Sequence, residues 1–292
     1  MPGIRKIKII KLSYLILLTT MTMSCQKDKH SDLTKIKKLS HSINEISGIT
    51  MLSDAKLYAI NDSGNDNTVF CLNQKGEIIN EIKIPGTKNI DWEDLAYDQE
   101  NNIYIGDFGN NNNDRKNLVI YKVNGLLSNT ISVEKIRFIF EDQKKFPPKK
   151  KNFNFDVEAF IHLNGNLYLF TKNRAKNSKG KTKLYKVSAT PGKYMAKLVG
   201  EYKTCEDSSN CLITGAAINH SGDHIALLTH NKVFLITDFT EDNLFNGNIK
   251  KIKLKHNSQK EGLCFKNDST LFITDEKSKY GKATLYEYRI KK

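Results

Sequence analysis

The sequence lacks the patterns that mark several large classes of protein. No segment sustains an apolar period of about 3.6 residues, which excludes a helical bundle. There is no phosphate-cradling P-loop, no zinc-binding motif and no ordered Ser-His-Asp signature. Four of the five prolines, at positions 85, 147, 148 and 191, mark turns between apolar segments. With 39% hydrophobic residues in 292, the chain can still bury the core of one large β domain.

What the sequence does contain is a set of short β-type segments that recur in pairs. The first members read ISGI (46–49), WEDL (92–95), VEAF (157–160), ITGA (213–216) and EGL (261–263). The second members read KLYAIND (56–62), NIYIGD (102–107), NLYLFTK (166–172), HIALLTH (224–230) and TLFITD (270–275). A motif that recurs every 46 to 65 residues predicts a radially repeated all-β fold, a β-propeller.

Each pair is followed by further strands. The predicted third strands are 68–73, 117–123, 182–188, 232–237 and 283–290, and the predicted fourth strands are 78–84, 134–140, 196–202 and 249–254. The last repeat has no fourth strand before the chain ends, and KIKKLS (35–40) near the N-terminus can supply it. This arrangement hides sheet edges and locks the ring. We therefore expect five blades of four strands, with the N-terminal strand closing the last blade.

The N-terminus has the features of an export signal. Basic residues precede the apolar run 12–23, which is too short to span a bilayer as a mature helix. The run ends at TMSC (22–25), which resembles a bacterial lipobox with Ser24 before the cysteine. We expect a lipoprotein signal peptide (1–24), lipidation of Cys25, a tether (25–33) and one propeller domain (34–292). The alternative is a plain signal peptide with an incidental cysteine.

Export and lipidation predict a location at the cell envelope, anchored to the outer membrane. In that oxidising compartment, Cys205 and Cys211 are expected to form a disulfide around a short polar loop. Cys71 and Cys264 lie within apolar strands and are predicted to be small core residues.

The formal net charge of +14 includes the predicted signal peptide, and lysines are scattered over every repeat. The densest run, 144–151, is interrupted by Pro147 and Pro148 and is typical of a solvated loop. No basic stripe is interleaved with aromatic residues, so we expect no nucleic-acid partner. Attraction to acidic surfaces or phosphorylated ligands stays open. We expect a monomer.

One position of the repeat carries oxygen-bearing side chains: Ser47, Glu93, Glu158, Thr214 and Glu261. If the first strands line a central tunnel, the three carboxylates meet at its axis and repel one another. A bound Ca²⁺ would remove this repulsion, since it accepts six to eight oxygen ligands at ~2.3–2.6 Å in tolerant geometry. The absence of His and Cys argues against zinc. The alternative is that the glutamates pair with lysines or face a watery channel.

Polar residues also follow each second strand, near the same end of the tunnel. The candidates for catalysis are Asp62, Asp107, His230 and Asp275, and the candidates for binding an anionic or polyol ligand are Asp107, Asn110, Arg115, Lys172 and Arg174. The loop 106–115 combines glycines, asparagines and an arginine that can hold a phosphate or carboxylate. The alternatives are that Asn, Gly and Asp serve tight turns, and that a single ring histidine is structural.

The repeated motifs resemble the blade openings of the SdiA-regulated family, exported bacterial five-bladed propellers of unknown activity. The motifs are ISGIT (46–50), DWED (91–94), FDVEAF (155–160), ITGAAIN (213–219) and KEGLCF (260–265). The order Ser–Glu–Glu–Thr–Glu is more distantly similar to that of the calcium-activated nucleotidases, or soluble apyrases, with Thr214 in place of a serine. That resemblance implies calcium in the tunnel. The nucleotide-binding features of the apyrases are not matched, because NDSGN (61–65) resembles their acidic loop only loosely.

Three functions follow from these features. The first is a lipid-anchored, calcium-binding propeller that binds a small anionic or polyol ligand, or an envelope protein, at the metal end of the tunnel. The second is a calcium-dependent phosphohydrolase, with the metal polarising a phosphoryl oxygen and Asp62, Asp107 or Asp275 orienting water. The third is a structural envelope scaffold. The fold cannot choose among them, because function resides in the site.

Overall fold

The computed structural model describes residues 32–128, 130–175, 180–206, 210–279 and 281–291. All of them belong to one compact unit, Ser31–Lys292. The predicted signal peptide, Cys25 and tether residues 25–31 lie outside the described residues.

In the described ranges the regular structure consists of twenty β-strands and three short 3-10 helices, η1 (His41–Ile43), η2 (Lys150–Asn152) and η3 (Leu244–Asn246). None of the helices in the described ranges is long and apolar enough to cross a membrane. The predicted all-β class is therefore confirmed.

The strands form three sheets of four strands and one of eight. The first four-stranded sheet contains β2 (Ile46–Met51), β3 (Leu57–Asn61), β4 (Thr68–Leu72) and β5 (Ile78–Lys83). The second contains β14 (Gly215–Ile218), β15 (Ile225–Thr229), β16 (Lys232–Thr237) and β17 (Asn248–Lys253). The third contains β18 (Lys260–Asn267), β19 (Thr270–Asp275), β20 (Thr284–Arg289) and, at its outer edge, β1 (Leu33–Lys38).

The eight-stranded sheet is made of two antiparallel sets of four. One set is β6 (Trp92–Tyr97), β7 (Ile103–Asp107), β8 (Val119–Asn124) and β9 (Ser132–Phe140). The other is β10 (Val157–Leu163), β11 (Asn166–Thr171), β12 (Lys181–Ser188) and β13 (Gly192–Lys203). The outermost strands, β9 and β13, pair in parallel from Gly192 opposite Ile136 to Ala196 opposite Phe140. The sequence did not predict this pairing, which joins two sets that were expected to be separate.

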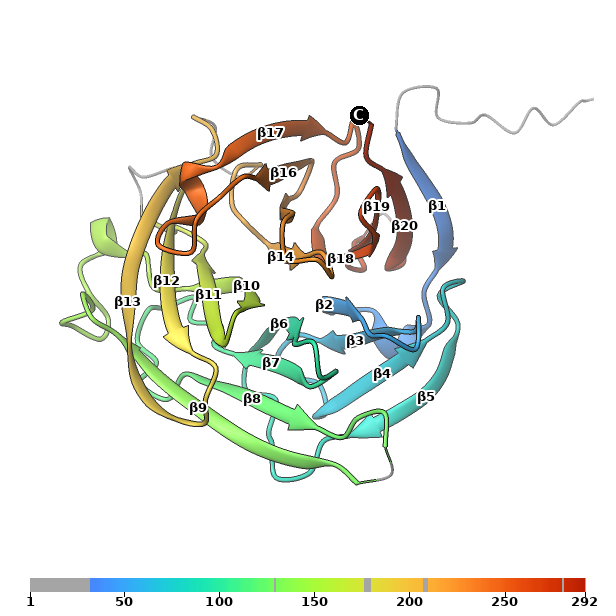
Figure 1. Ribbon diagram of the computed structural model, residues 1–292, viewed down its shortest axis with the longest axis horizontal. Coiled ribbons are helices and arrows are strands. Elements are labelled where there is room, and N and C mark those ends of the chain that lie inside the picture. Colours follow the sequence, from blue (N-terminus) through green and yellow to red (C-terminus); the bar gives the residue numbers. More distant parts are fainter. Residues whose placement is uncertain (1–31, 129, 176–179, 207–209, 280, 292) are drawn as a thin grey trace, which may run out of the picture. The chain divides into compact units, whose positions relative to one another are not determined.

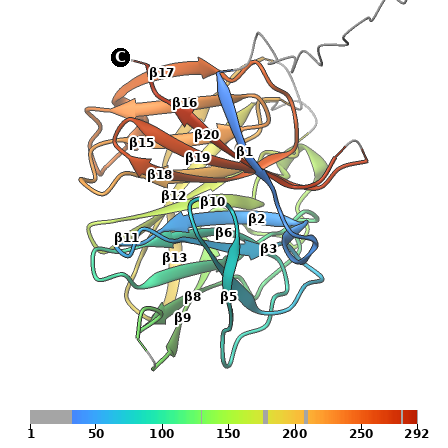
Figure 2. The same cartoon turned by 90° about the vertical axis from the view of Figure 1, so that its right-hand side faces the viewer.

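The sets of strands are arranged around a common centre (Figure 1). Their first strands lie innermost and contact one another in a closed ring, from β2 to β6, β10, β14, β18 and back to β2. The later strands of each set lie progressively farther from the centre (Figure 1), and Figure 2 gives the side view. This radial order is that of a β-propeller.

The N-terminal strand closes the ring as predicted. β1 pairs antiparallel with β20, with Leu33 opposite Tyr288 and Lys38 opposite Thr284. The next residue, Leu39, is 2% exposed, and its N–H bonds to the Ala283 carbonyl. The last set of strands therefore has no free outer edge at β20.

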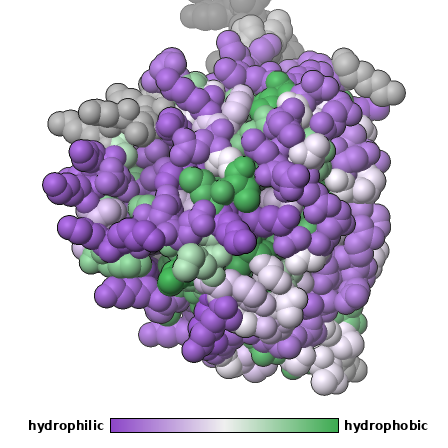
Figure 3. All heavy atoms as spheres, turned by 60° about the vertical axis from the view of Figure 1, so that its left-hand side comes forward, coloured by the Kyte–Doolittle hydropathy of each residue, from purple (hydrophilic) through white to green (hydrophobic). Residues whose placement is uncertain are grey.

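The core lies between neighbouring sets of strands, where buried hydrophobic side chains form five clusters. Trp92, for example, is fully buried and belongs to the cluster shared by β3 to β8. In contrast to this hydrophobic core, the surface on the side of β12 and β13 is mostly hydrophilic, with hydrophobic residues in small patches (Figure 3).

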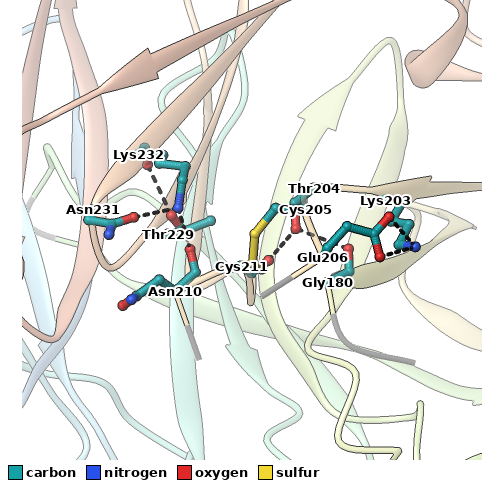
Figure 4. Close-up of a disulfide and its surroundings, with 10 residues drawn as sticks. All are labelled: Gly180, Lys203, Thr204, Cys205, Glu206, Asn210, Cys211, Thr229, Asn231 and Lys232. Carbon is teal, nitrogen blue, oxygen red and sulfur yellow. Dashed lines mark hydrogen bonds and ion pairs between the residues drawn. A yellow bond between two sulfur atoms is a disulfide. The ribbon is translucent and has the colours of Figure 1, made fainter. Parts of the chain in front are cut away.

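Cys205 and Cys211 form the predicted disulfide (Figure 4). Thr204 lies beside it, and its hydroxyl donates to the carbonyl oxygens of Gly180 and Cys211. Cys71 and Cys264 are free and buried, as predicted.

Candidate metal centre

Four of the five residues that were predicted to face the tunnel occupy β-bulges, whereas Thr214 lies directly before β14. The register of β2 shifts between Ile46 and Gly48, and the equivalent shifts in β6, β10 and β18 fall around Glu93, Glu158 and Glu261. A bulged residue has no direct partner in the ladder, so its side chain is turned away from the regular alternation. Repetition of the bulge explains how one sequence position delivers a polar side chain to the centre of the ring in successive sets of strands.

Carboxylates gather at the end of the ring where the inner strands begin. We call this group the acidic cluster; it consists of Asp62, Asp91, Glu93, Asp156, Glu158, Glu261 and Glu276. Ligand oxygens of Asp62, Asp91 and Glu93 lie within 4.8 Å of one another, and so do those of Glu93, Asp156 and Glu158. Glu93 belongs to both triads and is the carboxylate that joins them.

Two cations pair with Asp156 and Glu158 of the second triad. The Lys172 ammonium lies 2.8 Å from Glu158 Oε2, and Arg174 donates to both Asp156 and Glu158 Oε1. Burial alone would lower the pKa of Lys172, but the charges of Glu158, Glu261 and Glu93 raise it, which keeps the side chain protonated. Lys172 and Arg174 therefore act within the protein as counterions of the acidic cluster.

The first triad has no such counterion. Glu93 is only 6% exposed, and among the described residues no group donates a hydrogen bond or an ion pair to its carboxylate. Asp62 and Asp91 likewise form no ion pair within the described ranges. An unpaired buried carboxylate is costly unless it takes up a proton or a cation.

Gly109 packs closely against this triad. A Cβ at this position would overlap Glu93 Oε1 and Asp91 Oδ2. Glycine therefore lets the two carboxylates lie against the backbone. All the donors are carboxylate oxygens, the ligand type that suits a hard cation such as Ca²⁺.

Burial and the neighbouring negative charges raise the pKa values of these acids. Burial raises the pKa of Asp62 to about 6, with further contributions from Asp91 and Glu158. Burial and then the charge of Glu158 raise the pKa of Glu93 well above its ordinary range. Burial also raises the pKa of Asp91, although Arg115 opposes the change. Protons and metal ions therefore compete for the same oxygens.

The remaining predicted metal ligands have partners within the protein. Ser47 Oγ donates to the Trp92 carbonyl oxygen at 3.0 Å, and Thr214 Oγ1 donates to the Lys260 carbonyl oxygen at 2.6 Å. Both bonds tie one inner strand to the next. Glu261 accepts a hydrogen bond from Gln259 and interacts with Glu276, and burial together with the Glu261 charge raises the pKa of Glu276.

Asp107, Asn110 and Arg115 form a hydrogen-bonded group. Arg115 donates to Asp107 Oδ1 at 2.8 Å and to the Gly109 carbonyl at 2.7 Å. Asn110 receives the Arg115 N–H and donates its own N–H to Asp156. These three residues support Gly109 and the acidic cluster, and their hydrogen-bonding groups are largely engaged inside the protein. That they bind a ligand stays a prediction.

His230 and Asp275 lie near the buried Lys260. Burial, followed by the charges of Lys172 and Lys260, lowers the pKa of His230 to about 4, which leaves the ring neutral at pH 7. Asp275 Oδ2 accepts the Tyr286 hydroxyl at 2.9 Å, whereas its Oδ1 has no hydrogen-bond partner among the described residues. Lys260 is fully buried and donates to His256 and Ser258.

Sequence reasoning missed Asp91, Asp156 and Glu276. The first two stand two residues before Glu93 and Glu158, so the D-x-E pattern occurs at the same place in two repeats. In both repeats the aspartate stands directly before the first residue of the inner strand. That repeated spacing was the available signal. Glu276 follows a strand at a loop position, and no pattern marked it.

Several solved structures resemble this one. The PQQ-bound aldose sugar dehydrogenase of Streptomyces coelicolor has 10% identity and a TM-score of 0.51, with 87% of this chain and 97% of that chain covered. A gluconolactonase of Xanthomonas campestris has 11% identity and a TM-score of 0.45, with coverage of 84% and 72%. At these identities the likeness to the dehydrogenase concerns the fold alone. No curated protein matches the sequence.

The family comparison covers nearly the whole chain. The model of the SdiA-regulated family matches residues 24–284, which include every residue of the acidic cluster. The chain belongs to the SdiA-regulated family.

Proposed function

We propose that this protein is a calcium-binding, five-bladed β-propeller of the bacterial cell envelope, which holds a small anionic or polyol ligand, or a partner protein, at its acidic end. The blade count rests on treating β6–β9 and β10–β13 as two blades joined by the β9–β13 pairing. Each set has its own inner strand in the closed ring, and five core clusters separate neighbouring sets.

The observation that carries the calcium proposal is the environment of Glu93. This carboxylate is buried, lies within 4.8 Å of ligand oxygens from two pairs of acids, and receives no hydrogen bond from the described residues. Asp62, Asp91 and Glu93 would hold the ion, and Gly109 lets the carboxylates of Glu93 and Asp91 lie against the backbone. Bound there, Ca²⁺ would offset two of the three negative charges of the triad and offer its remaining coordination positions to an oxygen ligand.

This ligand set differs from the one predicted from the sequence, which was Ser47, Glu93, Glu158, Thr214 and Glu261. The predicted ligands Glu93 and Glu158 lie in the same cluster, but Lys172 and Arg174 already neutralise Glu158. We therefore place the ion beside Glu93 on the side of Asp62 and Asp91, while Ser47 and Thr214 hold neighbouring strands together.

The membrane part of the proposal rests on the sequence. The lipobox-like TMSC (22–25) supports lipidation of Cys25 and attachment to the envelope. Incorporation of labelled palmitate into the wild-type chain and its loss in Cys25→Ser test this step. Equal labelling of both chains would contradict it.

Thermal unfolding of the full-length protein with added Ca²⁺ and with chelator tests the binding proposal. A ligand that binds only the folded state raises its stability by about 2.7 kcal/mol at 100 times its Kd. We expect a higher melting temperature with millimolar Ca²⁺ and a smaller rise with Mg²⁺, which requires tighter octahedral geometry. A parallel screen of phosphoesters and nucleotides with Ca²⁺ separates ligand binding from phosphohydrolase activity.

A further inference from the structure

A second charged site lies outside the acidic cluster, in a hollow of about 560 Å³. We call it the lysine hollow, because its lining includes Lys144, Lys145, Lys149, Lys151, Lys181 and Lys183. The acids in the lining are Asp142 and Glu201. The lysine run that the sequence presents as a solvated loop therefore forms one wall of a cavity.

The two acids do not neutralise the hollow. Asp142 pairs with Lys183, and Glu201 pairs with Lys181 at 3.1 Å. Lys144 donates to the Glu141 carbonyl oxygen at 2.6 Å, a bond that leaves its charge uncompensated. Lys145, Lys149 and Lys151 form no ion pair with any described residue. The hollow therefore keeps a net positive charge contributed by the loop.

The loop that carries these lysines is held at both ends by one buried residue, through its backbone carbonyl and its side chain. Asn113 is fully buried; its carbonyl oxygen accepts from Gln143 Nε2 at 2.8 Å, and its Oδ1 accepts the Phe155 N–H at 2.8 Å. The loop between Gln143 and Phe155 is thus closed at its base. Fixing the backbone in this way reduces the entropy lost when the lysines gather around a ligand.

The hollow also borders the acidic cluster without sharing its charges. Along the segment 172–175, Lys172 and Arg174 face the carboxylates, whereas Asn173 and Ala175 line the hollow. Likewise Asp156 belongs to the cluster and Phe155 lines the hollow. Segment 172–175 and residues 155–156 therefore lie between the acidic cluster and the lysine hollow, with one side chain facing each site in turn.

We infer that the lysine hollow binds a ligand carrying two or more clustered phosphate groups. Flexible ammonium groups on different parts of one cavity wall suit several phosphate oxygens at once, and each charged hydrogen bond strengthens binding. The phosphates can come from a free polyphosphorylated molecule or from phosphorylated lipid headgroups, which present the same chemistry. This inference does not depend on calcium binding at Glu93.

Calorimetric titration of the full-length protein in detergent and chelator, with inorganic tripolyphosphate as the probe, tests the inference. We expect binding at low salt that weakens as salt is added. Lys149→Gln/Lys151→Gln should weaken binding by about tenfold or more, the loss expected from removing charged hydrogen bonds. The control Lys83→Gln/Lys253→Gln removes the same charge from exposed residues of β5 and β17 and should leave affinity within about twofold.

A second arm uses phosphatidylcholine vesicles with and without a phosphatidylinositol bisphosphate, a lipid whose headgroup carries clustered phosphates. Tripolyphosphate binding that depends on Lys149 and Lys151 assigns the site to free phosphate ligands, and binding of anionic vesicles alone with the same dependence assigns it to lipid headgroups. If neither probe binds, or if the control variant loses as much affinity as the hollow variant, the inference is wrong. Because chelator is present throughout, failure of the calcium proposal leaves this result unchanged.

Discussion

Glu93 and Glu158 occupy equivalent bulges in neighbouring inner strands, and their ligand oxygens lie within 4.8 Å of each other. Their partners differ. Glu158 is held by Lys172 and Arg174, whereas Glu93 receives no hydrogen bond or ion pair from the described part of the chain. The same position of the repeat therefore supplies an internal ion pair in one blade and an open ligand in the next.

This difference predicts opposite effects of the same substitution in chelator. Glu158→Gln leaves Lys172 and Arg174 with less negative charge and should destabilise the protein by about 2–4 kcal/mol. Glu93→Gln replaces a buried acid that has no cation partner and whose pKa is raised by burial and by Glu158, so it should be neutral or stabilising by up to about 2 kcal/mol. Urea unfolding measures the free energy of unfolding of both variants. Equal destabilisation by the two substitutions would show that Glu93 has a compensating partner.

The acidic cluster should give the metal-free protein an unusual pH dependence. Burial raises the pKa of folded Asp62 from 3.8 to about 6, so the folded state binds this proton more tightly than the unfolded state. The stabilisation from Asp62 is therefore present at low pH and is lost as the pH rises through about 6, and the raised pKa of Asp156 extends the loss toward 7.

Melting temperatures measured from about pH 5 to about pH 8 test this sign. In chelator they should fall as the pH rises, and in excess Ca²⁺ the fall should be smaller or reversed, because the ion replaces the protons. A rise in chelator that matches the rise in Ca²⁺ would mean that these acids do not carry raised pKa values.

Gly109 should tolerate no side chain. In Gly109→Ala the new methyl group overlaps Glu93 Oε1 and Asp91 Oδ2, so the carboxylates must move apart. We expect a loss of roughly 1–3 kcal/mol in stability, typical of overpacking, and a clear reduction in calcium-dependent stabilisation. Gly281→Ala is the matched control, because its Cβ would meet no atom within 4 Å. Thermal unfolding with and without Ca²⁺ compares them.

The N-terminal strand should be required for a stable ring. Deletion of residues 26–42 removes β1 and Leu39, which exposes the edge of β20 and uncovers part of the core. Lower melting temperature and aggregation seen by light scattering are expected. Deletion of 26–31 alone keeps β1 and should melt like the parent chain; equal melting after the longer deletion would contradict a closing role for β1.

Much of the fold could be predicted from local patterns. The segments 46–49, 92–95 and 157–160 begin β2, β6 and β10, because their apolar composition and turn residues are local properties. The parallel pairing of β9 with β13 could not be predicted, since it depends on how two outer strands meet in space. The lysine hollow escaped prediction for a similar reason, because residues from 142 to 201 line it together.

The site was only partly predictable. The repeated motif identified Glu93, Glu158 and Glu261 as one position, but the cation partners that distinguish Glu158 from Glu93 arise from tertiary contacts. Arg115 shows the same limit: its guanidinium is suited to a ligand, yet its donors bind Asp107 and Gly109.

Calorimetric titration of Ca²⁺ into the wild-type protein and Glu93→Gln tests the central claim most directly. The wild type should bind Ca²⁺ in the micromolar-to-millimolar range, and Glu93→Gln should bind at least about tenfold more weakly, because it loses the carboxylate shared by both triads. Absence of heat from calcium binding in the wild type, or equal affinity in both proteins, would contradict a calcium centre at Glu93.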